Sequence, residues 1–173
     1  MVNRRLDSNL AAIYDEHAPA LYAWLVSLTS DEEDTRDVMQ EVFCRLATHP
    51  RTLDDVQDAR AFLLRMARNA AYDLFRRRSA RQRTAETYQL ERVSPFAAEE
   101  DPDAKVFGEA LAGAMGELPA EQREVLHLKL WQGLTFERIG EVLAVSPDTA
   151  ASRYRYGIDK LRGLLRPIFE ELS

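Results

Sequence analysis

The stretch LTFERIGEVLAVSPDTAASRYRYGIDKLRGLL, residues 134–165, predicts two helices joined by a tight turn. Thr135 can cap the first helix, whose apolar residues recur at helical spacing until about Ala144. Ser146 can cap the second helix, where Pro147 at the first position loses no hydrogen bond. The pattern is typical of a helix-turn-helix pair, and the second helix has an apolar inner side made of Ala150, Tyr154, Ile158, Leu161 and Leu165.

The rest of the surface of the second helix carries hydroxyl and basic side chains. Such groups near the start of an exposed helix suit base edges and phosphates, which is how the second helix of a helix-turn-helix contacts DNA. An ordinary amphipathic helix pair would have the same spacing, so this stretch alone leaves both interpretations open. The side chains in question belong to Thr149, Ser152, Arg153, Arg155 and Tyr156.

The composition favours a helical protein of one domain or two small ones. The 173 residues are 46% hydrophobic and include only 7 glycines and 7 prolines. The net charge of −6 argues weakly against a protein that coats nucleic acid nonspecifically, although a total hides local fields. The single cysteine, Cys44, excludes an internal disulfide and lies in an apolar helical run, so we expect a buried and inert thiol.

The start of the chain and its apolar segments predict a soluble, cytoplasmic protein without membrane insertion. Arg4, Arg5 and Asp7 precede any apolar run, which is unlike a signal peptide. No apolar stretch approaches the length needed to cross a membrane.

The first half of the chain predicts helices with one acidic surface. Residues 10–28 have a helical apolar period, with a bend expected at Pro19. Residues 30–33, Ser-Asp-Glu-Glu, form a capping box that starts a second helix, which runs to about Thr48. This helix begins with acidic residues, and its polar outer face could meet a basic partner or simply be solvated. That acidic face consists of Asp37, Gln40 and Glu41.

A polar loop, residues 49–58, precedes a third predicted helix over residues 58–81. Between residues 65 and 83 lie seven arginines and one aspartate. A concentrated arginine patch in a chain of negative net charge indicates a polyanionic partner, and arginine favours bidentate phosphate contacts. A solubilising helix end explains a few of these charges but hardly all seven.

Residues 84–105 predict an acidic linker with two prolines and little apolar periodicity. Two more helices, over residues 106–116 and 120–131, precede the helix-turn-helix pair. We therefore expect an all-α fold of two small helical domains. The first, residues 1–83, is a three-to-four-helix bundle, and the second, residues 106–173, is a four-helix domain with the helix-turn-helix.

The sequence has no pattern typical of catalysis or metal binding. The three histidines, His17, His49 and His127, lie far apart, and there is no cysteine pair or HExxH motif. A glycine-rich phosphate loop and a GxSxG elbow are also missing. We therefore expect a binding protein without enzymatic activity, cofactor or metal.

Several motifs resemble the bacterial sigma factors of the extracytoplasmic-function (ECF) group, over nearly the whole chain. DVMQEVF, residues 37–43, looks like the family's D-x-x-Q-E-V-F run, and AFLLRMARNAAYDLFRRR, residues 61–78, is similar to the helix that contacts the −10 promoter element. Residues 118–162, from LPAEQ to DKLR, resemble the second domain, whose last helix reads the −35 element. Each motif alone is modestly specific, but all of them in this order and at this spacing are highly specific.

The resemblance implies a partner for each surface. The 37–43 run would dock on the clamp helices of the largest subunit of core RNA polymerase, through Asp37, Gln40, Glu41 and Phe43. The 49–58 loop would hold a base flipped from the non-template strand. The loop and the third helix would contact the −10 element of promoter DNA through Arg51, Thr52, Arg65, Arg68, Asn69, Asp73, Arg76 and Arg77. The helix-turn-helix pair would contact the −35 element through Arg138, Ser146, Pro147, Asp148, Thr149, Ala151, Ser152, Arg153, Arg155 and Tyr156. An anti-sigma factor is expected as a further partner.

The helix-turn-helix pair departs from the usual family pattern at a few positions. Ala150 and Ala151 stand where many relatives have a valine and a basic residue, and Tyr156 stands where an arginine is common. Gly140 replaces the usual alanine of the first helix. These departures concern the −35 sequence preference rather than the docking mode.

Two other classes of protein compete with this interpretation. A stand-alone helix-turn-helix regulator that binds duplex DNA as a dimer accounts for the C-terminal half, but it gives the acidic helix no role. An adaptor without a nucleic-acid role leaves the arginine patch unexplained.

Overall fold

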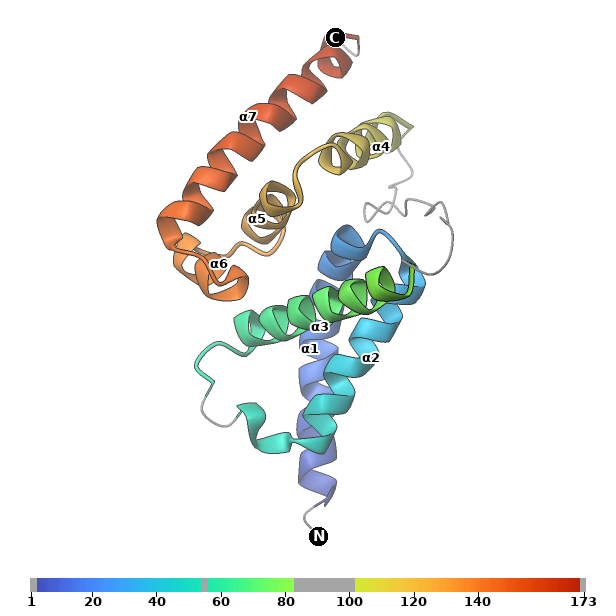
Figure 1. The fold of residues 1–173 in the computed structure, drawn as a ribbon, viewed down its shortest axis with the longest axis vertical. Helices are drawn as coiled ribbons and strands as arrows, with labels where there is room; N and C mark the ends of the chain where they lie inside the picture. Colours follow the sequence, from blue (N-terminus) through green and yellow to red (C-terminus); the bar gives the residue numbers. More distant parts are fainter. Residues whose placement is uncertain (1–2, 54–55, 83–101, 172–173) are drawn as a thin grey trace. The chain divides into compact units, whose positions relative to one another are not determined.

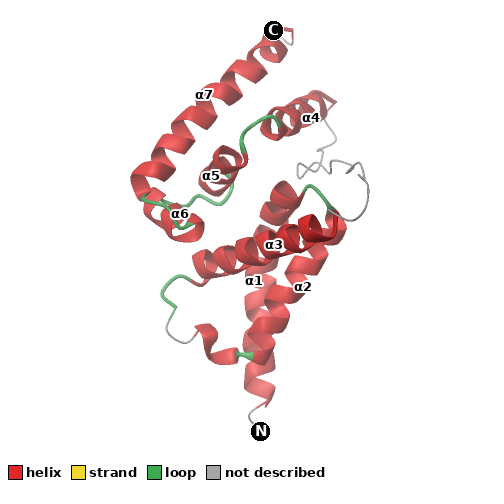
Figure 2. Cartoon of the chain, in the orientation of Figure 1, coloured by secondary structure: helices red, strands yellow, loops and turns green. Residues whose placement is uncertain are grey.

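The computed structural model describes residues 3–53, 56–82 and 102–171, and every regular element in these ranges is helical (Figure 2). The predicted all-α class is confirmed. The chain forms two compact units, one holding α1 to α3 and one holding α4 to α7. In chain order the elements are α1 (Asn3–Thr29), α2 (Glu32–Thr48), the 3-10 helix η1 (Pro50–Leu53), α3 (Ala59–Gln82), α4 (Pro102–Gly116), α5 (Ala120–Leu130), α6 (Phe136–Leu143) and α7 (Pro147–Glu171) (Figure 1).

The first unit is built from α1, α2 and α3, each of which contacts the other two. On α3 the small residues Ala67, Ala70 and Ala71 are fully buried, which lets the neighbouring helices approach closely. Large apolar side chains from all three helices fill the space between them. The largest of these fully buried side chains are Leu21, Trp24, Leu25, Val38, Val42, Leu63 and Leu64.

The junction between α1 and α2 differs from the prediction by one residue. Ser30 adopts a left-handed conformation (φ 55°), and its N–H donates to the carbonyl of Val26 (2.9 Å), which ends α1. Asp31 is extended, and its carboxylate accepts a hydrogen bond from the N–H of Asp34 (2.8 Å). Asp31 is therefore the cap of α2. The prediction that Ser30 caps this helix is wrong, because Ser30 ends α1 instead.

The thiol of Cys44 is exposed, so the expectation of a buried cysteine is wrong. Val42 and Leu46 are the buried residues of this part of α2. Cys44 lies two positions from each of them, and a helix turns by about 200° over two residues, so its side chain points away from the core.

The second unit is organised by α7, which contacts α4, α5 and α6. Gly157 allows one close approach, because a Cβ atom there would lie 3.0 Å from Cδ1 of Leu126 on α5.

The helix α4 begins at Pro102, four residues before the predicted start, and proline suits the first turn of a helix. Residues 84–101 of the predicted linker lie outside the described ranges. One apolar cluster of this unit contains Ala114, Met115, Leu118, Leu126, Leu161 and Leu165.

Candidate nucleic-acid and partner interfaces

The helices α6 and α7 form the predicted helix-turn-helix pair. The hydroxyl of Thr135 accepts a hydrogen bond from the N–H of Arg138 (3.3 Å), which caps α6. The hydroxyl of Ser146 accepts one from the N–H of Thr149 (3.1 Å), just where α7 begins at Pro147. Both predicted caps and the predicted position of the proline are confirmed.

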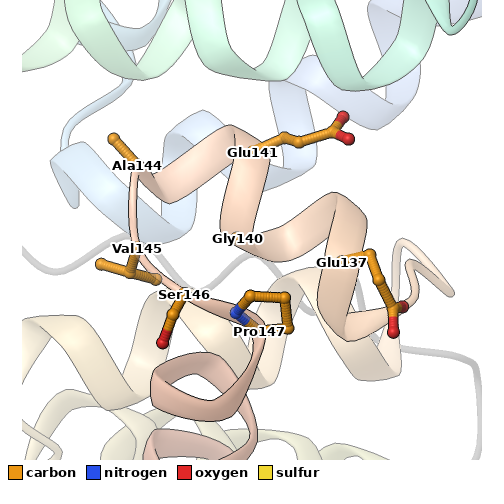
Figure 3. A pocket seen from close by; sticks show the side chains of 7 residues that line it. All are labelled: Glu137, Gly140, Glu141, Ala144, Val145, Ser146 and Pro147. Carbon is orange, nitrogen blue, oxygen red and sulfur yellow. The ribbon is translucent and has the colours of Figure 1, made fainter.

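The turn between the two helices runs close to α6 at Gly140. Ala144 ends α6 in a left-handed conformation (φ 55°), and the N–H of Val145 donates to the carbonyl of Gly140 (3.0 Å). A Cβ atom on Gly140 would lie 2.7 Å from the carbonyl oxygen of Val145, so the absence of a side chain permits this turn. Beside the turn lies an open hollow, drawn in Figure 3 and lined by Glu137, Gly140, Glu141, Ala144, Val145, Ser146 and Pro147.

Most of the predicted −35 contacts lie on the surface at the start of α7. Ala151, Ser152 and Arg153 are half-buried, and Arg138 on α6 is half-buried beside Glu141, with 2.7 Å between Nη1 and Oε2. The others are exposed, namely Ser146, Pro147, Asp148, Thr149, Arg155 and Tyr156.

The ring of Tyr156 is the most exposed large apolar group of the described side chains, at 61%. The guanidinium of Arg155 lies over this ring, 5.6 Å from its centroid. A planar cation and an exposed ring on one helix can meet bases and phosphates together. The neighbouring Ala150 is fully buried, so it supports α7 from the core side.

The acidic face lies on α2. Asp37 and Gln40 are exposed, and the carboxylate of Glu41 is half-buried between Arg45 and Arg77. At the edge of this face, the half-buried ring of Phe43 contacts the ring of Tyr14 edge-on, with 4.7 Å between the centroids.

Tyr14, on α1, is 50% exposed and was missed as a candidate contact. The sequence signal was present but ambiguous, because Tyr14 fits the apolar period of its helix as well as a surface role.

The predicted −10 contacts on α3 combine cations with aromatic rings. The guanidinium of Arg65 lies 5.4 Å from the ring centroid of Phe62, and that of Arg68 lies 4.5 Å from the ring centroid of Tyr72. Arg65 and Asn69 are exposed.

The predicted contacts before α3 lie in η1. The hydroxyl of Thr52 donates to the carbonyl of His49 (2.6 Å), so it supports the turn of the chain here. The side chain of Arg51 lies outside the described part, as do the side chain of Arg81 and the whole of Arg83.

Three consecutive arginines of α3 each have a carboxylate partner in the same unit. Arg76 binds Asp73 one turn earlier on α3. Nη2 of Arg77 lies 3.4 Å from Oε2 of Glu41 on α2. Arg78 binds Asp34, also on α2. The arginine patch is therefore partly neutralised by acids from its own unit.

The pair of Asp34 and Arg78 is the most buried of these. The Asp34 side chain is 2% exposed and that of Arg78 is 41% exposed. Burial raises the pKa of Asp34, and the positive charge of Arg78 opposes that rise. Arg78 therefore compensates a buried carboxylate, which is a structural role that residue types and helical spacing could not reveal across a separation of 44 residues.

Two other pKa shifts bear on the two units. A hydrogen bond from Arg76 lowers the pKa of Asp73, so this carboxyl stays ionised beside the arginines. In the second unit, burial lowers the pKa of His127 to about 4, so its ring is neutral at neutral pH.

Within the described residues, no group of three His, Cys, Asp or Glu side chains could hold a metal ion. The helices in the described ranges include none with the length and hydropathy of a membrane span.

Both units match known families of one functional class. The model of sigma-70 region 2 matches residues 13–81, and that of sigma-70 region 4 matches residues 114–163. The first match covers α2 and most of α3 and α1, and the second covers α5, α6 and most of α7.

Individual relatives match along most of their length. The chain is 32% identical to ECF RNA polymerase sigma factor SigL of Mycobacterium tuberculosis, over 92% of this chain and 90% of SigL. It is 29% identical to RNA polymerase sigma factor SigZ of Bacillus subtilis, over 91% of this chain and 87% of SigZ. The fold is similar to that of the sigma factor RpoE solved in complex with the anti-sigma factor NepR from Bartonella quintana, with a TM-score of 0.77 and 22% identity over 94% of this chain and 98% of RpoE. The chain belongs to the ECF RNA polymerase sigma factors.

Proposed function

We propose that this sigma factor divides its contacts among three surfaces, with the acidic face of α2 on core RNA polymerase, α3 on the −10 element and α7 on the −35 element. As a member of its family, the chain binds core RNA polymerase and directs transcription initiation at promoters. The observation that carries the division is the order of the two sigma-70 regions along the chain, each on its own helical unit with its own basic helix.

The acidic face suits a basic surface of the polymerase. Asp37 and Gln40 are exposed and offer a carboxylate and an amide to a partner. The aromatic pair of Tyr14 and Phe43 borders them, and partly exposed aromatic side chains are frequent anchors of protein interfaces. We therefore add Tyr14 to the polymerase-binding residues predicted from the sequence.

The surface of α3 suits a melted −10 element. The cations of Arg65 and Arg68 lie over aromatic rings, an arrangement that supports stacking of an unpaired base and contact with its phosphate. Arg76 and Arg77 are exposed enough to exchange a carboxylate for a phosphate. Such contacts would offset the few kcal/mol that unstacking a base costs.

The start of α7 suits the major groove of the −35 element. Helix N-termini and their first side chains commonly contact phosphates and base edges. Arg153 and Arg155 would contact phosphates or guanine edges, while Thr149 and Ser152 would add adaptable hydrogen bonds.

An inhibitory protein is a further partner in this proposal. Two solved structures of similar fold are RpoE in complex with the anti-sigma factor NepR and CnrH in complex with the cytosolic domain of CnrY. By analogy, an anti-sigma factor would cover the polymerase-binding surfaces of the free chain. The protein would work in the cytoplasm with RNA polymerase, as a binding protein rather than a catalyst.

Three experiments test the function. Purified protein should co-migrate with core polymerase on a sizing column, and run-off transcription on a randomised promoter library should select a −10 and a −35 element. A mobility shift on the selected duplex should depend on core polymerase. Strong specific binding by the protein alone would instead favour the stand-alone regulator, which leaves the sigma-70 region 2 match without a role.

A further inference from the structure

Five charged side chains from α2 and α3 form an ion cluster. Oε1 of Glu41 lies 2.5 Å from Nη2 of Arg45, and Oε2 of Glu41 lies 3.4 Å from Nη2 of Arg77. Asp73 binds Arg76, and the charges of Arg77 and Arg45 also reach it. The cluster therefore consists of Glu41, Arg45, Asp73, Arg76 and Arg77.

The ion cluster joins residues of two proposed interfaces. Glu41 belongs to the acidic face, and Arg76 and Arg77 belong to the −10 surface. The side chains of Glu41 and Arg77 are 30% and 58% exposed, so an approaching partner can reach both. A phosphate that binds Arg77 must compete with the Glu41 carboxylate, and a cation of the polymerase that binds Glu41 must compete with Arg77.

The three arginine–carboxylate pairs differ in whether a partner protein can open them. The carboxylate of Asp34 is buried, so no cation of a partner can take it from Arg78. Asp73 lies on α3 itself, outside the acidic face. Only the pair of Glu41 and Arg77, among these three, links a carboxylate of the acidic face to an arginine of the −10 surface.

We propose that Glu41 shields Arg77 in the free protein, and that polymerase binding at Glu41 releases Arg77 for DNA. The inference rests on the proposed function, which places Glu41 on polymerase and Arg77 on the promoter. Coupling between two binding sites is reciprocal, so DNA on Arg77 must strengthen polymerase binding by the same factor. Exposed ion pairs are weak, so we expect a factor of about two to five.

The test measures DNA binding by the full chain without polymerase, on a labelled single-stranded oligonucleotide at low salt. Glu41→Gln should tighten binding by about two- to fivefold, because the shield is removed. Glu32→Gln is the matched control, because Glu32 pairs with Arg36 one turn later on the same helix at 2.5 Å, as Glu41 does with Arg45, but has no pair with α3 among the described residues. In an Arg77→Gln background, Glu41→Gln should tighten binding no more than the control does.

The same variants test the reciprocal effect on core polymerase. Arg77→Gln should tighten polymerase binding by a similar factor, because it leaves Glu41 available, and thermal unfolding of each variant checks that the fold is intact. If Arg77→Gln weakens DNA binding while Glu41→Gln behaves like Glu32→Gln, the coupling is overturned and the proposed function stands. If Arg77→Gln leaves DNA binding unchanged in the Glu41→Gln background, where Arg77 is no longer shielded, both the coupling and the −10 assignment of Arg77 are overturned.

Discussion

The two helices that we propose to contact DNA present their arginines in different ways. On α3, Arg76, Arg77 and Arg78 each lie against a carboxylate of the same unit. On α7, neither Arg153 nor Arg155 forms an ion pair within the described residues, and Arg155 lies over the ring of Tyr156. DNA would therefore have to displace acids to reach these three arginines of α3, whereas the start of α7 would offer its cations directly.

This difference separates two ways of keeping a basic surface specific. A carboxylate that competes with phosphate weakens nonspecific binding to any nucleic acid, and it lets a partner protein control when the cation becomes available. An open cation beside an exposed ring favours immediate contact with a groove. The first arrangement suits a contact that follows polymerase binding, and the second suits initial recognition of duplex DNA.

The largest effect is expected where an arginine of α3 compensates a buried acid. Arg78→Ala should lower the free energy of unfolding of the first unit by roughly 2 kcal/mol, less than the loss of a fully buried pair because Arg78 is partly exposed. Urea unfolding at neutral pH measures this, with Arg36→Ala, which breaks an exposed pair, as the control.

The loss of unfolding free energy caused by Arg78→Ala should shrink as the pH falls. Burial already raises the pKa of Asp34, and removal of Arg78 takes away the charge that opposes the rise. The folded variant then holds the proton of Asp34 more tightly than the unfolded chain does. The contribution of protonated Asp34 to stability is therefore present at low pH and is lost as the pH rises through the pKa of Asp34 in the folded state. A loss that is equal at acidic and neutral pH would contradict the structural role of the pair.

A substitution in the turn should affect only the second unit. Gly140→Leu should cost about 2 kcal/mol, because the new side chain meets the carbonyl of Val145 and the turn must open. It should also weaken binding to a −35 duplex. Gly163→Leu is the control, because a Cβ atom at Gly163 would meet nothing within 4 Å. If Gly140→Leu and Gly163→Leu had the same free energy of unfolding, the turn would accommodate a side chain at Gly140 and the prediction would be wrong.

The open cations of α7 should matter for sequence preference. Arg153→Ala and Arg155→Ala should each cost about 1–2 kcal/mol in holoenzyme binding if the residue makes a bidentate base contact, and they should relax selection at one −35 position. Selection of promoters by each variant holoenzyme measures this. If binding weakened equally for all promoter sequences, the arginine would contact a phosphate rather than a base.

The smallest effect should come from the shielded cations of α3. Arg76→Ala combined with Arg77→Ala should weaken promoter opening without weakening polymerase binding, and each lost phosphate contact should reduce the salt slope by about one. Fluorescence of a labelled −10 region at several salt concentrations measures both. If this variant lost polymerase binding, Arg76 and Arg77 would contact polymerase rather than DNA, and their assignment to the −10 element would be wrong.

The sequence predicted those features that depend on neighbouring residues. The caps at Thr135 and Ser146 and the proline at the start of α7 follow local rules, and the helical class follows from periodicity. The cap at Asp31 was missed because a left-handed Ser30 first had to end the previous helix.

The site residues were predicted as types rather than as pairs. Seven arginines indicated a polyanion partner, but the pairing of Arg77 with Glu41 spans 36 residues and depends on how α2 packs against α3. Helical spacing places a side chain on a face without saying which neighbouring helix lies opposite. The contact between Tyr14 and Phe43 was hidden for the same reason.

One helix, α7, combines the proposed contact with DNA and a packing role in its unit. Its 25 residues make a rod of about 37 Å. Its first turns are the proposed promoter contact, while Leu161 and Leu165, toward its other end, pack in the apolar cluster with α4. Because α5 and α6 also pack against this rod, a shift of its anchorage at Leu161 and Leu165 would move α6 and the first turns of α7 together. Mutations distant from DNA could then retune which promoters are chosen.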